Sequence, residues 1–169
     1  LKSKLSKSSI QEIVEANLKE IFGITLLASK YCLEKNTKET MDTLGVDDNN
    51  QLVIIEYRSD RFGQVLNKGP FFLDYVQKNN SEFKILANDV LGDAIAKNIV
   101  FPARVIVIGE DFNKYDEHAV SALGVDISLI KYYVVKKDTV LFEQMYSSVK
   151  LQYAYNAELH NTWFELLEE

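Results

Sequence analysis

An acidic and a basic side chain stand close together at the end of an apolar run, in NNQLVIIEYRSD at residues 49–60. Side chains alternate across a β-strand, so Glu56 and Arg58 share one face of this run with the apolar Leu52. Both faces begin apolar, which is typical of a strand that is covered on both sides. A carboxylate and a guanidinium on one side of such a strand indicate either a chemical site or an ion pair.

Asp42 joins these residues if the chain turns back through a short hairpin. The segments TMDTLGV and QLVIIEYR flank a polar cluster, DDNN, whose composition suits a turn. A three-residue loop centred on Asn49 places Asp42 directly opposite Glu56, with Cβ atoms about 5 Å apart. A four-residue loop shifts the register by one residue and moves Asp42 to the other face. The chemistry of the pair therefore depends on the turn.

Two carboxylates at this separation repel each other unless a proton or a cation lies between them. Oxygens from an Asp and a Glu, completed by a backbone carbonyl and water, suit Mg²⁺ or Mn²⁺. The strand would then hold a metal ligand rigidly, and Arg58 would face a phosphate or an attacking water. The structural alternative is an ordinary ion pair between Glu56 and Arg58, with Asp42 serving the turn.

Asp116, Glu117 and His118 form a second group of side chains that could bind a metal. Adjacent residues on a helix point in different directions, so these three cannot all face one ion. We therefore expect a solvated helix face here.

The elements that position these residues follow from periodicity and from capping and turn signals. We predict an α/β fold with a mixed sheet. The predicted elements are a helix at 8–23, a strand at 24–33, a hairpin of strands at 40–46 and 51–58, a helix at 64–78 interrupted at Gly69 and Pro70, a helix at 81–99 with a break near Gly92, a strand at 104–111, a helix at 112–124, a hairpin at 125–146 and a helix at 154–169.

Length and composition describe one ordinary globular domain: 169 residues, 47% hydrophobic and 26% charged. The net charge of -6 does not attract a phosphate backbone, so any contact with nucleic acid must come from a local patch such as Arg58, Arg61 and Lys68. A single cysteine excludes a disulfide framework, and no apolar run approaches the ~20 residues of a membrane span. We expect a cytoplasmic protein without a membrane segment.

Several segments, taken in order, resemble one known family. The stretches DTLGVDDNNQLVIIEYR at 42–58 and NKGPFFLDYV at 67–76 look like the RIDTLGID…VIIEYK and NQGLFYLDWL motifs of a bacterial branch of the PD-(D/E)xK nuclease superfamily. The stretches EANLKEIFGITLLASKY at 15–31 and FNKYDEHAV at 112–120 are similar to that branch as well. The resemblance runs from about residue 10 to residue 135.

This resemblance implies an α/β fold with a mixed central sheet and the αβββαβ core of restriction endonucleases, followed by a C-terminal hairpin and helix. It implies a nuclease-like domain at 1–150 and a helical tail at 151–169 that could lead to a further domain. The implied activity is metal-dependent cleavage of phosphodiesters in DNA or RNA, with Mg²⁺ or Mn²⁺ as cofactor. Asp42, Glu56 and the Tyr57 carbonyl are the implied ligands, and Glu15 matches a helix glutamate that approaches the same metal.

Three positions depart from the family pattern. Arg58 stands where the family has lysine, and because arginine does not lose its proton it could orient water or stabilise charge but not act as a base. Lys68 replaces a glutamine and Phe72 a tyrosine, so that Lys68 could partly replace the missing lysine as a cation. The rival hypothesis is therefore a non-catalytic nucleic-acid-binding or protein-assembly module that keeps the fold. Whether the domain is a nuclease or a non-catalytic module, a second copy or a downstream domain could help it to hold nucleic acid.

Overall fold

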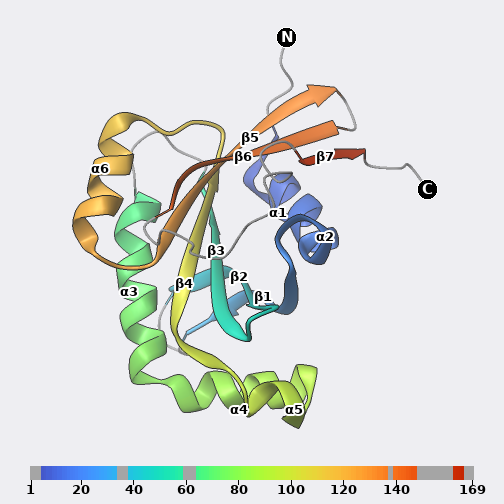
Figure 1. Ribbon diagram of the computed structural model, residues 1–169, viewed down its shortest axis with the longest axis vertical. Coiled ribbons are helices and arrows are strands. Elements are labelled where there is room, and N and C mark those ends of the chain that lie inside the picture. The colour runs from blue at the N-terminus through green and yellow to red at the C-terminus, as the bar shows by residue number, and fades with distance from the viewer. Residues whose placement is uncertain (1–4, 34–37, 59–63, 137–138, 148–161, 166–169) are drawn as a thin grey trace.

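The computed structural model describes residues 5–33, 38–58, 64–136, 139–147 and 162–165, and shows a mixed sheet with helices against it (Figure 1). The first part of the chain contains two helices followed by three strands. In chain order the elements are α1 (Lys7–Ala16), α2 (Leu18–Phe22), β1 (Ile24–Cys32), β2 (Thr40–Asp47), β3 (Gln51–Tyr57), α3 (Gln64–Lys78), α4 (Asn80–Leu91), α5 (Asp93–Ala96), β4 (Val100–Gly109), α6 (Lys114–Leu123), β5 (Ile127–Lys136), β6 (Thr139–Ser147) and β7 (Thr162–Glu165).

The strands follow one another across the sheet in chain order, from β1 to β7. β1, β2 and β3 are antiparallel neighbours, β4 and β5 run parallel to β3, and β6 and β7 are again antiparallel. A parallel pair needs a crossover connection, which α3, α4 and α5 supply between β3 and β4. The mixed α/β class and the αβββαβ order are confirmed.

The strand β3 is buried on both of its faces, as its apolar run predicts. Leu52 and Ile54 pack into one apolar cluster together with side chains of α3 and α4. Val53 and Ile55 pack into a second cluster with side chains of α1 and α2. Figure 1 shows α3 and α6 on one side of the central strands and α1 and α2 on the other. The sheet is therefore the middle of three layers, and all but the first residue of β3 are buried.

The helix α1 begins at Lys7, one residue before the predicted start. Ser6 caps it, because the Ser6 hydroxyl accepts a hydrogen bond of 3.1 Å from the backbone N–H of Ser9. The predicted helix is divided at Asn17, and its second part ends at Gly23, which adopts φ 65°. This start makes Lys7 a residue of the first turn.

The helix α3 runs through Gly69 and Pro70 without the expected interruption. A Cβ atom at Gly69 would lie 3.1 Å from Ile127 Cδ1, so the glycine lets α3 approach the sheet closely. α3 is 15 residues long. Within the described ranges, the structure contains no helix that combines the length and the apolar character of a membrane span.

The tail differs from its prediction. Thr162–Glu165 lie in the segment expected to be helical, and they form the strand β7, which pairs with β6. Their sequence, TWFE, is rich in residues with high strand propensity, and β6 offers an edge with unpaired backbone groups. Helical spacing of apolar residues does not reveal such an edge. The other residues of 151–169, and the boundary expected at residue 150, lie outside the described residues.

Candidate functional site

The hairpin between β2 and β3 has the register that the three-residue loop predicts. Thr43 lies opposite Ile55, and Gly45 lies opposite Val53. Asp47 closes the turn, because its Oδ1 accepts hydrogen bonds of 2.9 Å from the backbone N–H groups of Asn49 and Gln51. This register continues to Asp42 and Glu56, which lie opposite each other where the ladder ends.

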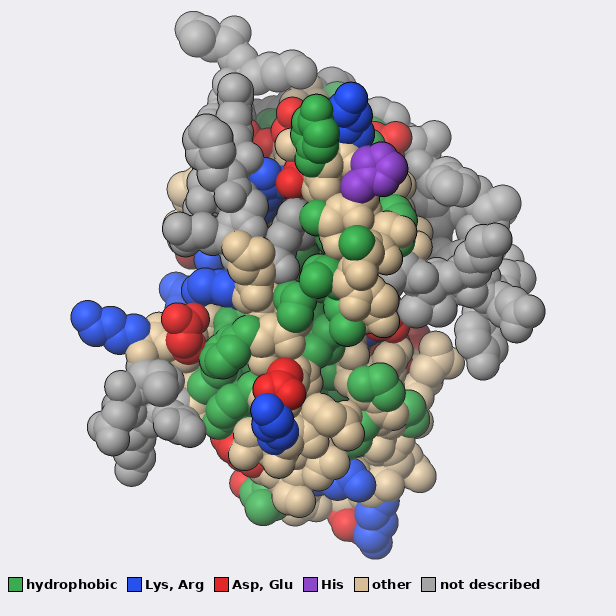
Figure 2. Space-filling view, turned by 90° about the vertical axis from the view of Figure 1, so that its left-hand side faces the viewer, with side chains coloured by type: hydrophobic (Ala, Val, Ile, Leu, Met, Phe, Trp, Pro, Cys, Tyr) green, Lys and Arg blue, Asp and Glu red, His purple; other side chains and the backbone are tan. Residues whose placement is uncertain are grey.

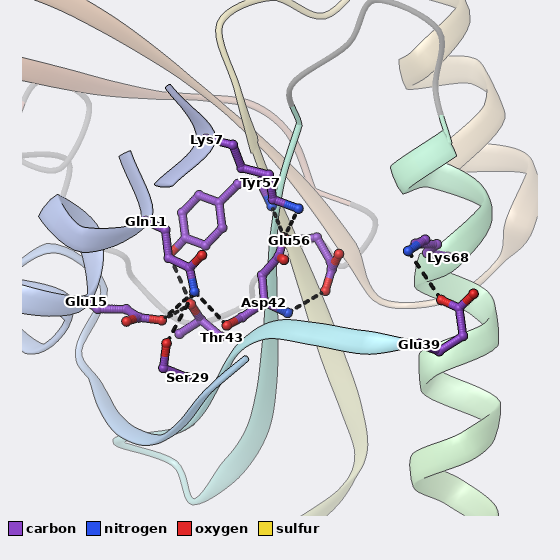
Figure 3. A network of polar contacts seen from close by, with 10 residues as sticks. All are labelled: Lys7, Gln11, Glu15, Ser29, Glu39, Asp42, Thr43, Glu56, Tyr57 and Lys68. Carbon is purple, nitrogen blue, oxygen red and sulfur yellow. Dashed lines mark hydrogen bonds and ion pairs between the residues drawn. The ribbon is translucent and has the colours of Figure 1, made fainter. Parts of the chain in front are cut away.

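The carboxylates of Asp42 and Glu56 each accept a hydrogen bond from a backbone N–H of the other strand (Figure 3). The backbone N–H of Asp42 donates to Glu56 Oε1 at 3.0 Å, and the backbone N–H of Tyr57 donates to Asp42 Oδ2 at 3.0 Å. Both acidic residues are buried, with 9% of Asp42 and 2% of Glu56 exposed. The two carboxylates therefore continue the pairing of β2 and β3 with side-chain oxygens, and they are fixed next to each other.

This arrangement disfavours the charged form of Glu56. Burial, followed by the negative charge of Asp42, raises the pKa of Glu56 to about 8. The hydrogen bond from the Asp42 backbone and the positive charges of Lys7 and Lys68 act in the opposite direction. A proton or a cation therefore stabilises the pair, as its spacing in the sequence suggested.

Two lysines from different helices supply positive charge near the pair. Lys7 of α1 places its Nζ 2.7 Å from Asp42 Oδ2. Lys68 of α3 pairs with Glu39, with 3.2 Å between Nζ and Oε2, just before β2 begins. Figure 3 shows Lys7 above Asp42, and Lys68 on α3, beyond Glu56. Lys68 thus lies near the pair, where the sequence suggested a cation. The sequence analysis did not identify Lys7 as a residue of this site.

Arg58 is directed toward α6. Its NH1 lies 2.8 Å from Asp116 Oδ2, and the two side chains are only 4% and 9% exposed. The guanidinium carbon also lies 5.3 Å from the centre of the Phe112 ring. Asp116 Oδ2 accepts a second hydrogen bond, of 2.9 Å, from the backbone N–H of Asn113, which caps α6. The expectation that Asp116 belongs to a solvated helix face is therefore wrong, because this side chain is the buried partner of Arg58.

Glu15 lies on the opposite face of the sheet from the carboxylate pair. Its Oε1 accepts hydrogen bonds from Gln11 Nε2 at 2.9 Å and from Thr43 Oγ1 at 2.5 Å. The Thr43 hydroxyl also lies 3.2 Å from the hydroxyl of Tyr57. Side chains alternate along β2, so a contact with Thr43 is a contact on the side away from Asp42. The structure thus separates Glu15 from the pair, and the Tyr57 side chain lies on the Glu15 side.

The helix α1 nevertheless contacts the backbone of the site. Gln11 is 4% exposed, and its Nε2 donates a hydrogen bond of 2.8 Å to the carbonyl oxygen of Asp42. The same amide contacts Glu15, so one buried side chain connects the helix to β2. This contact fixes the backbone of Asp42 from the face opposite its carboxylate.

The carboxylate oxygens of Asp42 and Glu56 suit a hard divalent cation that takes only a few of its ligands from the protein. Within the parts of the chain that the structure describes, no three or more His, Cys, Asp or Glu side chains form a group that could hold a metal ion. Two carboxylates remain, and Mg²⁺ commonly binds through one or two carboxylates, retaining water as its other ligands. The Tyr57 carbonyl is the only ligand expected here from the backbone. Arg61, which was expected near a phosphate, lies outside the described residues.

Comparisons with known proteins gave three similar solved structures. The chain is similar to a repair endonuclease from Pyrococcus abyssi, with 12% identity and a TM-score of 0.49 over 78% of this chain and 49% of that chain. It is similar to EndoMS in apo form, with 14% identity and a TM-score of 0.47 over 76% of this chain and 48% of that chain. The EndoMS-dsDNA2 complex gives 13% identity and a TM-score of 0.42 over 78% and 47%.

This chain therefore spans about half the length of each of these solved chains. No protein-family model matches the sequence. No curated protein matches it either.

Proposed function

We propose that this chain is a nucleic-acid-binding domain that hydrolyses phosphodiester bonds with a divalent cation held by Asp42 and Glu56. The observation that carries this function is the pairing of two buried carboxylates across the β2–β3 hairpin, each one bonded to a backbone N–H of the other strand. Their oxygens are of the hard type that Mg²⁺ and Mn²⁺ prefer. DNA and RNA are both candidate substrates, because they share the phosphodiester group.

The residues around the pair have separate roles in this function. Asp42 and Glu56 each supply a carboxylate oxygen to the ion, and the backbone carbonyl of Tyr57 is the third protein ligand. The ion supplies Lewis acidity for the hydrolysis. Lys68 adds positive charge near Glu56, which favours an incoming phosphate. The buried strands on which the carboxylates stand keep them in place before the substrate arrives.

A non-catalytic nucleic-acid-binding or protein-assembly module is the second candidate. Two observations favour it. Arg58 occupies the position of the family's lysine, and its guanidinium is bound to Asp116. In the described ranges, no third acidic side chain completes a metal cluster with Asp42 and Glu56. A module of this kind would keep the fold without metal-dependent cleavage, so metal binding and cleavage have to be measured separately.

Thermal unfolding with and without millimolar Mn²⁺ tests the metal site. An ion that binds only the folded protein raises the unfolding midpoint, and we expect D42N and E56Q to abolish that rise. Both substitutions keep the size of the side chain and remove its charge. D48N is the matched control, because Asp48 forms an exposed ion pair with Lys19 on another part of the surface. A wild-type midpoint that Mn²⁺ does not change would contradict the metal site, as would an equal rise in D42N and E56Q.

A nuclease assay then separates the two candidates. Single- and double-stranded DNA and RNA are incubated with the protein in Mg²⁺ or Mn²⁺, and E56Q serves as the control for contaminating nuclease. We expect cleavage by the wild type and none by E56Q. A rise in the unfolding midpoint without any cleavage would favour the non-catalytic module. Gel filtration with and without nucleic acid would show whether a second copy takes part in binding.

A further inference from the structure

Lys7 forms an ion pair with Asp42, with 2.7 Å between Nζ and Oδ2. We propose that Lys7 binds a phosphate of the nucleic-acid strand beside the Asp42–Glu56 pair, the role that the sequence suggested for Arg58. This inference rests on the proposed function, and it adds the side chain that contacts the substrate. Three features of the structure support it: the position of Arg58, the position of Lys7 and the charges around the pair.

Arg58 is bound in a way that opposes contact with a substrate. Its guanidinium pairs with Asp116 and lies over the ring of Phe112, and 4% of its side chain is exposed. Moving it toward a phosphate would leave the buried carboxylate of Asp116 without this cation, which is energetically costly. Position 58 therefore holds α6 against the end of β3, and the site needs a cation from another element.

Lys7 reaches the site from α1, on the other side of the pair. Its backbone is fixed as the first residue of a helix that Ser6 caps, and its side chain is 39% exposed. The amine can therefore contact Asp42 and also meet a ligand that arrives from solvent. Lysine binds phosphate as a compact charge with three rotatable donors, so it does not need the fixed geometry of a guanidinium.

The charges around the pair favour an exchange of partners when a substrate binds. In the described structure the charge of Lys7 compensates that of Asp42. Lys68 pairs with Glu39, and the Lys68 and Glu39 side chains are 40% and 45% exposed. A phosphate that approaches the pair brings negative charge to a place where two carboxylates already repel it. Contact with the Lys7 amine offsets that repulsion, and it leaves Asp42 Oδ2 to the divalent ion. Lys7 then acts on the substrate while Asp42 acts as a ligand.

Nucleic-acid binding measured at several salt concentrations tests this inference without relying on cleavage. Fluorescence anisotropy of labelled single- and double-stranded DNA and RNA is recorded for wild type, K7M and K7R, in EDTA and in Ca²⁺. Each phosphate contact contributes about one unit to the slope of log affinity against log salt. We expect K7M to weaken binding and to reduce this slope by about one, and K7R to keep the slope of the wild type.

K19M is the matched control, because Lys19 also pairs with an aspartate but lies on the surface away from the carboxylates. It should bind DNA with the affinity and the slope of the wild type. The unfolding midpoint of each variant is measured alongside, and K7Q replaces K7M if the methionine variant is less stable. If Lys7 had only a structural role, K7M would lower the unfolding midpoint and leave the slope of log affinity against log salt unchanged.

The outcomes distinguish this inference from the proposed function. K7M with the wild-type slope would overturn the role of Lys7, whereas the metal site would still be supported by the Mn²⁺ rise in the midpoint. A reduced slope in K7M without any Mn²⁺ rise in the wild type would support Lys7 and overturn the metal site. A wild type that binds neither DNA nor RNA, in EDTA or in Ca²⁺, would overturn the phosphate contact and the nucleic-acid function together.

Discussion

At the scale of single residues, Glu56 is an acid placed where its own charge is disfavoured. Its carboxyl group is buried, and the neighbouring Asp42 adds a like charge, so that its pKa is raised to about 8. A buried carboxylate charge of this kind destabilises the folded protein unless a proton or a cation neutralises it. Leu52 and Ile54 on the same face show that an apolar side chain is compatible with the strand. The acid at position 56 therefore combines a structural hydrogen bond to the Asp42 backbone with a charge that needs compensation.

The pH dependence of stability tests this description of Glu56. Its pKa is higher in the folded state than the unfolded value of 4.5, so its stabilising contribution is complete below about pH 4.5 and is lost as the pH rises through about 8. We expect the free energy of unfolding in EDTA to fall by on the order of a few kcal/mol across this range from this group. Urea unfolding at pH 5.5, 7 and 8.5 measures it.

E56Q should show a flatter dependence on pH than the wild type, because glutamine has no proton to lose. E12Q is the matched control, since Glu12 is an exposed residue of α1. It should keep the slope of the wild type. Equal slopes in wild type and E56Q would show that the Glu56 carboxyl group is not perturbed by its surroundings.

At the scale of elements, the pair of Arg58 and Asp116 connects the end of β3 to the start of α6. Both side chains are buried, and Asp116 also closes the capping box of that helix. Removing one partner of a buried pair leaves an uncompensated charge, so we expect D116A to lower the free energy of unfolding by about 3–5 kcal/mol. D93A is the control, because its pair with Lys97 is exposed, and it should cost less than about 1 kcal/mol. Chemical denaturation compares the two variants.

R58K asks whether a lysine would serve at position 58 in this chain. The arginine lies against Phe112 and is bound to Asp116, and lysine cannot reproduce its planar shape. We expect R58K to destabilise the protein and to leave cleavage at or below the wild-type rate. A clear gain in the cleavage rate, measured under the same Mn²⁺ conditions, would show instead that the arginine limits catalysis.

Close contact between β1 and β2 is a second requirement at this scale. A Cβ atom at Gly45 would lie 2.4 Å from Ile24 Cγ2 and 2.8 Å from the backbone oxygen of Thr25. We expect G45A to cost about 3 kcal/mol of unfolding free energy, near the upper end for overpacking. G124A is the comparison, because its added Cβ meets nothing within 4 Å and only the backbone at φ 65° is strained. Equal losses in urea unfolding would show that the contact with β1 adds nothing.

At the scale of the whole molecule, acidic side chains outnumber basic ones, 25 to 19. The net charge is -6, and Figure 2 shows lysines and arginines scattered among acidic and apolar side chains on the face formed by α3 and α6. Binding of a nucleic acid must therefore depend on a few local contacts, which makes Lys7 and Lys68 important out of proportion to their number. Such binding should weaken with salt, as the slope measurement for Lys7 requires.

The parts of the fold that could be predicted from the sequence are those set by local patterns. The apolar alternation of β3 indicated a strand covered on both faces, and the polar turn near Asn49 set the register that brings Asp42 to Glu56. Contacts between distant segments carry no such pattern. Lys7 reaches Asp42 only because α1 crosses the sheet there, and Asp116 meets Arg58 only because α6 packs beside α3. The strand β7 depends in the same way on the edge of β6.

The order of the strands across the sheet has a consequence for how the protein assembles. Because each strand lies beside the one that precedes it in the chain, most pairings join segments that are close in sequence, and such arrangements are reached quickly during folding. The earliest of these pairings, between β1, β2 and β3, already bring the two acids face to face. A ribosome-bound nascent chain would thus bring Asp42 and Glu56 together before the crossover helices are complete, and if the pair binds a divalent ion as proposed, that ion would favour the early hairpin.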